Sequence, residues 1–188
     1  MVMCSHKWVG LAAVVVTTLV QAPAWADEPV TANSVQLGAG FRYGIEMNEG
    51  DFNPFGVGLG LSGGYTMPNA VYLGGNFDYF FGDSVEGGGS KVSGNVWQLM
   101  AEGGYDIGLG SNFVIRPKLG AGLGTIRAEV CLDGFGCNSD SSTKFALAPG
   151  ATFVFLTQHF GLSLDLRYAM IFADDTAKAL IFSAGIGF

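Results

Sequence analysis

The sequence has few charged residues and few cysteines, and beyond its first 26 residues it lacks long hydrophobic runs. Charged residues make up 13% of the 188 residues, about half the usual share in globular proteins. After residue 26 no apolar stretch approaches the roughly 20 residues of a membrane-spanning helix, which excludes a helical membrane protein. The formal net charge is −7 at pH 7, so nucleic acid is not expected as a partner.

One apolar run is present, at the N-terminus. Residues 8–20 follow Lys7 and precede Ala24-Trp25-Ala26, which is the pattern of a secretory signal peptide over residues 1–26, cleaved after Ala26. The run is shorter than the roughly 20 residues that span a bilayer, so a membrane anchor is the weaker interpretation. Residues 27–34 are then a short N-terminal periplasmic segment, and the mature length suits one domain.

Two cysteines remain in the mature chain, Cys131 and Cys137, in the stretch CLDGFGC. In an exported protein such a closely spaced pair predicts a disulfide. Zinc is a poor alternative, because His159 is the only histidine after the signal peptide and no spacing completes a set of four ligands. No metal and no other cofactor is expected.

The mature chain contains many segments in which large apolar residues alternate with small or polar ones. In VQLGAGFRYGIEMN, residues 35–48, large apolar residues mostly occupy every second place, while glycine and polar residues fill the places between. This period of two is that of a β-strand. Seven more segments show it, at 56–67, 71–81, 95–107, 113–125, 144–156, 160–172 and 179–188. Pro117 and Pro149 fall within two of them, where a bulge or a shifted boundary is expected because proline donates no ladder hydrogen bond.

The connections between these segments alternate in length. Those after the second, fourth and sixth segments are short, whereas the others are mostly longer and more acidic. Short turns at one end and long loops at the other are typical of outer-membrane barrels. The segment lengths also fit a tilted crossing, which needs roughly 9 to 11 residues.

The large apolar residues are expected to face outward. The lumen of an eight-stranded barrel is narrow, so it has room for glycine, serine, alanine and a few charges but not for several large side chains from every strand. Lipid then covers the outer face, and closure leaves no unpaired strand edge in the hydrocarbon. The sequence therefore predicts an all-β, eight-stranded antiparallel transmembrane up-and-down β-barrel over residues 35–188.

The chain ends in LIFSAGIGF, where Phe182, Ile186 and Phe188 stand at alternating apolar places. With this ending and the eight alternating segments, the chain resembles the OmpA/OmpX/opacity-type family of eight-stranded outer-membrane barrels. The resemblance implies location in the outer membrane of a Gram-negative bacterium, with outer-membrane lipid and lipopolysaccharide as surroundings. It also implies that these three residues form an assembly signal for the barrel assembly machinery. A monomer is expected.

Charged residues on the inward places gather near the middle of the predicted barrel. They are Arg42, Asp78, Glu102, Arg116, Lys118, Asp165 and Arg167. Opposite charges in a narrow interior should pair, because an unpaired buried charge costs several kcal/mol. The favoured interpretation is a salt-bridged plug that fills the lumen, and the alternative is a gate on a path for small ions.

A second set of basic residues lies in or beside the predicted outer loops. Lys91, Arg127, Lys144 and Lys178 are candidates for contacts with lipopolysaccharide phosphates through charge-assisted hydrogen bonds. A solvated rim is an equally good interpretation of them.

Catalysis is not expected. Lipid-modifying barrels of similar size need a histidine near a serine on the outward side, but Ser84 has no histidine near it and His159 belongs to the opposite end. The predicted function is a non-catalytic envelope role, either structural support or surface interaction and adhesion through the extracellular loops. A small-solute pore or a hydrophobic-solute channel is the alternative.

Overall fold

The computed structural model describes residues 35–48, 53–87, 90–132, 136–157, 159–173 and 176–187. The predicted signal peptide, residues 27–34 and Phe188 lie outside these ranges. The strands are β1 (Val35–Glu46), β2 (Gly56–Thr66), β3 (Val71–Gly87), β4 (Ser90–Tyr105), β5 (Ile107–Gly108), β6 (Phe113–Leu132), β7 (Gly136–Leu156), β8 (Gly161–Ile171) and β9 (Ala177–Gly187). Within the described ranges no helix is long and apolar enough to cross a membrane.

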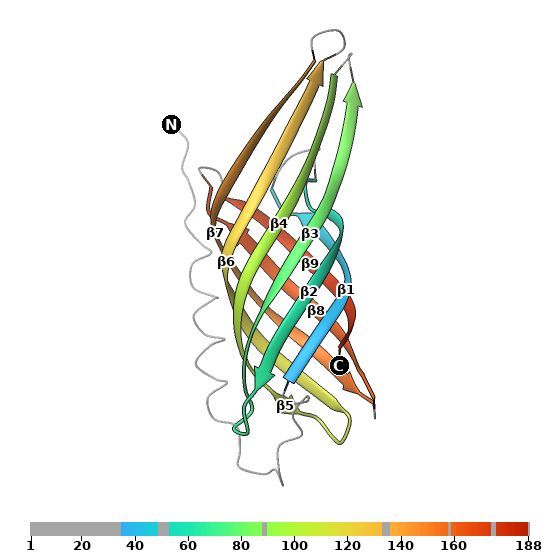
Figure 1. Ribbon diagram of the computed structural model, residues 1–188, viewed down its shortest axis with the longest axis vertical. Helices are drawn as coiled ribbons and strands as arrows, with labels where there is room; N and C mark the ends of the chain where they lie inside the picture. Colours follow the sequence, from blue (N-terminus) through green and yellow to red (C-terminus); the bar gives the residue numbers. More distant parts are fainter. Residues whose placement is uncertain are drawn as a thin grey trace, which may run out of the picture.

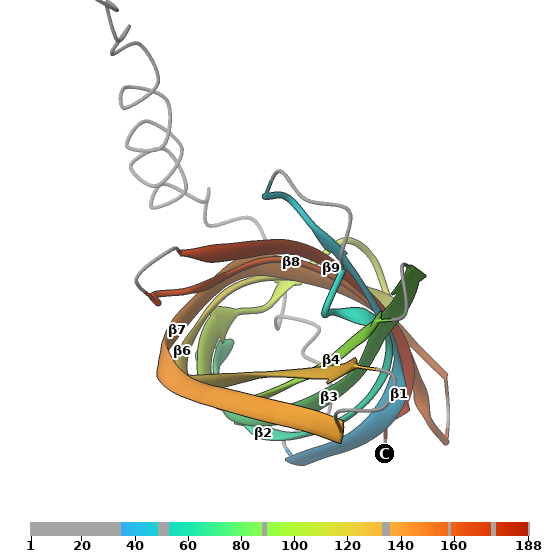
Figure 2. The ribbon, with the colours of Figure 1, turned by 90° about the horizontal axis from the view of Figure 1, so that it is seen from above.

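The strands form one closed antiparallel sheet (Figures 1 and 2). Its order is β4-β3-β2-β1-β9-β8-β7-β6-β5, and pairing of β4 with β6 closes the cylinder. β5 continues β4 after an interruption at Asp106 and pairs with the same strand, β6, so eight strands form the wall. The predicted all-β, eight-stranded up-and-down barrel is confirmed.

The outer surface of the barrel is apolar, as predicted. Phe41 is 71% exposed and Leu37 is 65% exposed, whereas Arg42, the residue next to Phe41, is 8% exposed. Because successive side chains of a strand point to opposite faces, this contrast assigns the large apolar residues to the outside and the charged ones to the lumen.

Two hairpins are longer than the sequence predicts. Residues 82–94 and 126–143 were expected mainly as connections, but β3, β4, β6 and β7 continue through them and project beyond one end of the barrel (Figure 1). β4 and β6 stay paired as far as Ser90 and Leu132, so the hairpins form a single four-stranded extension, here called the projecting sheet. These segments carry few large apolar residues, so the sequence does not mark them as lipid-facing strands.

Pro117 and Pro149 both lie inside unbroken β6–β7 pairing, so the predicted bulges or shifted boundaries are wrong. The β7–β8 ladder skips Ala148 and Pro149 and resumes at Gly150 in the same register. Pro117 lies in a similar gap, between the end of the β4–β6 pairing at Lys118 and the β5–β6 pairing at Ile115. A gap in one ladder is enough to accommodate a residue without an N–H group. The register shift that does occur between β3 and β4 lies between Phe81 and Ser84, at the base of the projecting sheet.

The lumen near the projecting sheet is filled by an apolar layer, which the sequence does not predict. Phe55, which precedes β2, is fully buried against Phe80, with ring centroids 5.6 Å apart. Glycines on the facing strands make room: a Cβ on Gly44 would lie 2.6 Å from the Cβ of Phe55, and one on Gly124 would lie 2.7 Å from Ile171. The layer also contains Val96, Met100, Ala146, Ala148, Ala169, Ala177, Ala179 and Ile181.

Candidate functional site

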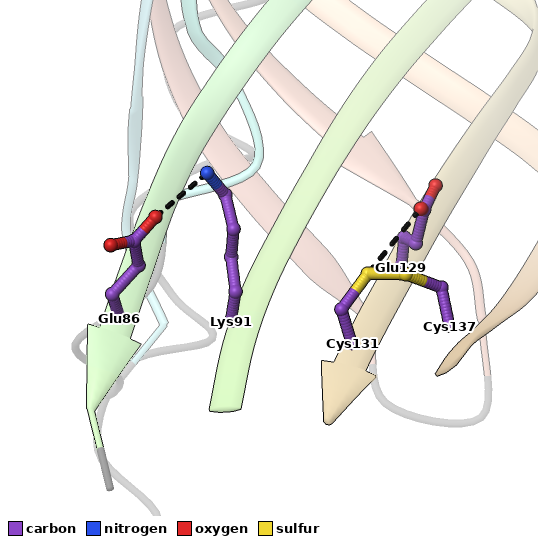
Figure 3. Close-up of a disulfide and its surroundings, with 5 residues drawn as sticks. All are labelled: Glu86, Lys91, Glu129, Cys131 and Cys137. Atoms are coloured by element: carbon purple, nitrogen blue, oxygen red, sulfur yellow. Dashed lines mark hydrogen bonds and ion pairs between the residues drawn. A yellow bond between two sulfur atoms is a disulfide. The ribbon is translucent and has the colours of Figure 1, made fainter. Parts of the chain in front are cut away.

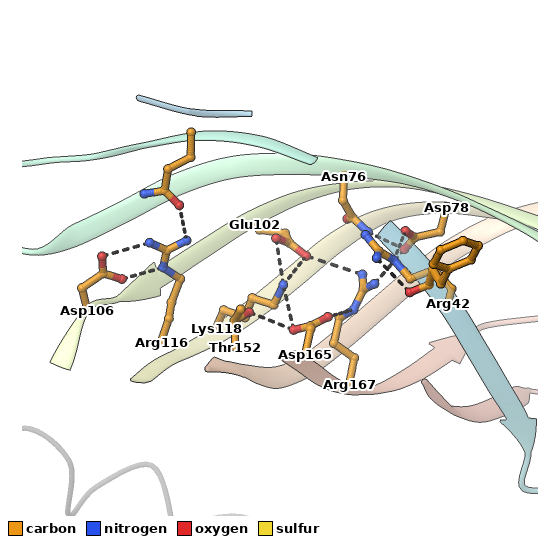
Figure 4. Close-up of polar contacts among 12 residues, drawn as sticks. Arg42, Asn76, Asp78, Glu102, Asp106, Arg116, Lys118, Thr152, Asp165 and Arg167 are labelled. Atoms are coloured by element: carbon orange, nitrogen blue, oxygen red, sulfur yellow. Dashed lines mark hydrogen bonds and ion pairs between the residues drawn. The ribbon is translucent and has the colours of Figure 1, made fainter. Parts of the chain in front are cut away.

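Arg167 of β8 is the centre of a charged network in the lumen (Figure 4). The residue is 1% exposed, and its Nη2 lies 2.9 Å from Oδ2 of Asp78. Its Nε lies 2.6 Å from Oδ2 of Asp165, and its Nη1 lies 3.6 Å from Oε1 of Glu102. One guanidinium therefore links carboxylates from three strands across the lumen.

Asp78 of β3 also forms an ion pair with a second arginine, Arg42. Arg42 Nε donates to Asp78 Oδ1 over 2.8 Å, and the side-chain amide of Asn76 donates to Asp78 Oδ2. On the neighbouring strand, a Cβ at Gly60 would overlap both Asp78 and Arg42. Glycine at position 60 is therefore a steric requirement of this ion pair.

Lys118 of β6 joins two other carboxylates of the network. Its Nζ lies 3.1 Å from Oε1 of Glu102 and 3.1 Å from Oδ1 of Asp165. Thr152 Oγ1 donates to the same Asp165 oxygen over 2.8 Å. These contacts continue the network from β8 to β6 and β4.

Arg116 forms a separate pair with Asp106 toward the short-turn end (Figure 4). Arg116 Nη2 lies 2.9 Å from Asp106 Oδ2, and Nη1 donates to Gln36 over 2.9 Å. The guanidinium carbon lies 3.8 Å from the centre of the Tyr72 ring, which is a cation–π contact. The sequence places Asp106 on an inward position near a strand end, and so its pairing with the central Arg116 was missed.

The seven predicted lumen charges and Asp106 thus form two groups of contacts whose charges balance. The cations are Arg42, Arg116, Lys118 and Arg167, and the anions are Asp78, Glu102, Asp106 and Asp165. Balanced pairing offsets the cost of burying each charge, which is several kcal/mol for an isolated ion. On the short-turn side of the network the lumen holds a cavity of about 90 Å³.

The four basic residues predicted beside the outer loops are spread over the structure. Lys91 lies in the projecting sheet and forms an ion pair with Glu86 at 2.7 Å (Figure 3). Arg127 is exposed on β6, and Lys178 is exposed near the start of β9. Lys144 is half-buried, on the same side of β7 as the buried Ala146.

The ion pair in the projecting sheet shifts the pKa values of both partners. The hydrogen bond with Lys91 lowers the pKa of the Glu86 carboxyl below its ordinary value of 4.5. The same hydrogen bond raises the pKa of Lys91 above 10.5. Both groups are exposed, so solvent screens their attraction strongly.

A disulfide joins Cys131 of β6 to Cys137 of β7 near the tip of the projecting sheet (Figure 3). The two cysteines are direct partners in the β6–β7 register. Glu129 Oε1 lies 3.6 Å from the sulfur of Cys131. The bridge therefore fastens the far end of the second projecting hairpin.

Two of the three predicted assembly-signal residues can be placed. Phe182 and Ile186 face outward from β9 and are 44% and 48% exposed. His159 is exposed in the turn after β7, whereas Ser84 belongs to the projecting sheet, so the structure does not bring this histidine and serine together.

Comparisons with known proteins agree with this architecture. Among curated proteins none matches the sequence significantly. Ail of Yersinia pestis, solved with the heparin analogue sucrose octasulfate, is 23% identical, with a TM-score of 0.56 over 82% of this chain and 97% of Ail. Neisserial surface protein A is 18% identical, with a TM-score of 0.56 over 82% of this chain and 96% of its own.

A major outer membrane protein of Thermus thermophilus has the same fold, at 13% identity and a TM-score of 0.60 over 83% of this chain and 99% of its own. The sequence profile of the outer membrane protein beta-barrel domain matches residues 12–188. The closed barrel, its apolar outer face and this match show that the chain belongs to the outer membrane protein beta-barrel domain family and is located in the outer membrane.

Proposed function

We propose that this protein is a non-conducting and non-catalytic barrel that acts in the envelope through its extracellular side. The observation that carries the proposal is the closure of the lumen by two successive layers. The first is the apolar layer around Phe55 and Phe80, whose side chains are fully buried. The second is the charge-balanced network around Arg167.

The two layers oppose different solutes. An ion that crossed the apolar layer would lose its hydration shell, and the side chains of the layer carry no charge that could replace it. A hydrophobic solute would have to displace the buried contacts between Arg167 and Asp78, which leaves unpaired charges behind. This combination disfavours both the small-solute pore and the hydrophobic-solute channel.

Surface interaction is assigned to the projecting sheet. Long connections of outer-membrane barrels lie on the extracellular side, and the sheet continues the longest connections of this chain. The disulfide of Cys131 and the ion pair of Lys91 restrain its end, so its shape is defined before any partner arrives. Ail, which has a similar fold, is named an attachment invasion locus protein and was solved with a heparin analogue.

The remaining assignments follow the membrane location. Lys91, Arg127 and Lys178 are exposed and are proposed to contact lipopolysaccharide phosphates, whereas Lys144 lies on the lumen side of β7 and is left out of this proposal. Phe182, Ile186 and Phe188 are proposed as the signal for the barrel assembly machinery. A monomer is proposed as well, because the sheet closes within one chain and needs no strand from a second copy.

Conductance tests the closed lumen. Refolded mature protein, shown to be folded by its shifted mobility in an unboiled detergent gel, is inserted into a planar bilayer. We expect no steady channels at moderate voltage. Steady single-channel conductance that changes when Arg116 or Asp165 is neutralised contradicts the proposal and favours the pore.

Surface interaction needs a separate test. A variant in which residues 84–93 are replaced by a short turn keeps the membrane-embedded strands and loses one projecting hairpin. We expect equal surface levels of both proteins on cells and weaker attachment of the shortened one to a host-cell layer. Equal attachment would remove the projecting sheet from the proposed role.

A further inference from the structure

Three potential metal ligands converge near the tip of the projecting sheet. Cys131 and Cys137 face each other across β6 and β7, and Glu129 lies two residues before Cys131 on the same face. The two sulfurs and a carboxylate oxygen of Glu129 all lie within 4.8 Å of one another (Figure 3). Neither the lumen network nor the proposed envelope role uses Glu129.

We propose that this tip binds a thiol-seeking divalent metal such as Zn²⁺ when the disulfide is reduced, with Cys131, Cys137 and Glu129 as ligands. A tetrahedral zinc ion holds sulfur at about 2.3 Å and carboxylate oxygen at about 2.0–2.2 Å. Its two sulfur ligands then stand about 3.8 Å apart. Two facing thiols reach this separation by small side-chain rotations once the bond between them has opened.

The site differs from the zinc site that the sequence argues against. The sequence offers no set of four protein ligands, whereas the sheet register supplies three. Three protein ligands with water in the fourth position are an established coordination of zinc in proteins. The carboxylate of Glu129 is recruited by strand geometry, because residues 129 and 131 share one face of β6.

The site can bind a metal only after the disulfide has been reduced. Two molecules of a small thiol supply two electrons and two protons to the disulfide, which yields the thiols of Cys131 and Cys137 and one small-molecule disulfide. Metal binding then releases the two thiol protons, since the thiolate is the ligand. Cys137 is exposed, so a small thiol can reach its sulfur.

The ligands stay together after reduction. β6 and β7 pair from Phe113 opposite Phe155 to Leu132 opposite Gly136, so the ladder continues on both sides of the cysteines. On the neighbouring strand Lys91 is the register partner of Cys131 and is held by its ion pair with Glu86. The sheet thus presents the two thiols in advance, and metal binding does not need to fold a loop.

Cobalt titration of the folded mature protein tests the proposal. The protein is reduced with a phosphine, freed of the phosphine without oxygen, and titrated with Co²⁺, whose thiolate complexes absorb strongly. We expect absorption that saturates at one Co²⁺ per chain and is abolished by Cys131→Ser. The disulfide form should give none.

Two variants test whether Glu129 is a ligand of the metal. Glu129→Gln should weaken Co²⁺ binding at least tenfold, whereas Asp140→Asn, which removes an exposed carboxylate on the opposite face of β7 from Cys137, should leave it unchanged. Gel mobility shows that each variant has folded. Absence of thiolate absorption in the reduced protein, or equal affinity of the Glu129→Gln variant, would overturn the site, and neither result bears on conductance or attachment.

Discussion

Arg167 and Asp78 lie 89 positions apart in the sequence, and their side chains meet in the lumen with Nη2 and Oδ2 2.9 Å apart and both residues almost completely buried. Arg167 also contacts Asp165 and Glu102. The opposite walls of the barrel are therefore cross-linked by one side chain. Through this contact Arg167 joins Asp78 to the charge-balanced group that also contains Glu102 and Asp165.

Truncation of Arg167 should be strongly destabilising. Arg167→Ala leaves Asp78 with one arginine fewer and Glu102 and Asp165 with Lys118 as their shared cation. Breaking a buried ion pair by removing one partner costs about 3–5 kcal/mol. Urea unfolding in lipid vesicles measures this, and Arg127→Ala, at an exposed arginine, should change stability by less than about 0.5 kcal/mol. Equal stability of the two variants would show that the network contributes little.

Gly60 provides a steric test of the same network. Gly60→Ala places a Cβ on top of Asp78 and Arg42, so the ion pair must move. We expect a loss of about 1–3 kcal/mol in unfolding free energy, as for other overpacked interiors. The matched control is Gly103→Ala, whose Cβ would meet one atom, at 4.0 Å on Leu73. If both variants unfold at the same urea concentration, the proposed clash is absent.

Substitution of Gln98 measures what burial of a polar side chain without a hydrogen-bond partner costs in unfolding free energy. Its side chain is fully buried, and neither amide atom has a hydrogen-bond partner. Replacing an unsatisfied buried polar group by an apolar one of similar size is nearly neutral or stabilising. Gln98→Met should therefore keep or raise the urea midpoint of unfolding. A loss of unfolding free energy above about 1 kcal/mol would mean that the Gln98 amide forms hydrogen bonds in the membrane-embedded protein.

The sequence predicted the wall of the barrel well because lipid imposes a simple rule on it. Phe41 and Arg42 alternate in the sequence, and they alternate between lipid and lumen in the structure. The projecting sheet was missed because water surrounds it, so its strands need no apolar face. Phe55 was missed for another reason: it enters the lumen from a connection, where no periodicity points inward.

The sequence predicts which charged residues lie in the lumen better than it predicts which of them form ion pairs. All seven predicted central charges are inward, but the partner of Arg116 is Asp106 at a strand end. Strand tilt shifts the height of facing residues, so counting along each strand does not give the contacts between distant strands. Contacts such as Arg167 with Asp78 need the register of every strand between them.

The ion pair of Glu86 and Lys91 gives the projecting sheet a defined pH dependence. The folded pKa of Glu86 is lowered, so its contribution is present above 4.5 and is lost as pH falls through the folded value. The raised pKa of Lys91 gives a contribution that is present below 10.5 and is lost as pH rises through its folded value. A carbon NMR titration should place the Glu86 midpoint below 4.5, and Lys91→Met should return it to about that value. An unchanged midpoint in Lys91→Met would show that the pair does not persist in solution.

Phe182 tests whether the last strand carries an assembly signal beyond its contact with lipid. Phe182 and Phe153 both face outward, at 44% and 36% exposed, but Phe182 belongs to the last strand, β9. Serine at either position removes a similar apolar surface from the lipid-facing belt, so refolding from urea into detergent should suffer equally. In cells, Phe182→Ser should deplete the outer-membrane pool several-fold more than Phe153→Ser. Equal depletion would mean that both phenylalanines act through membrane burial, with no separate recognition of the C-terminal strand.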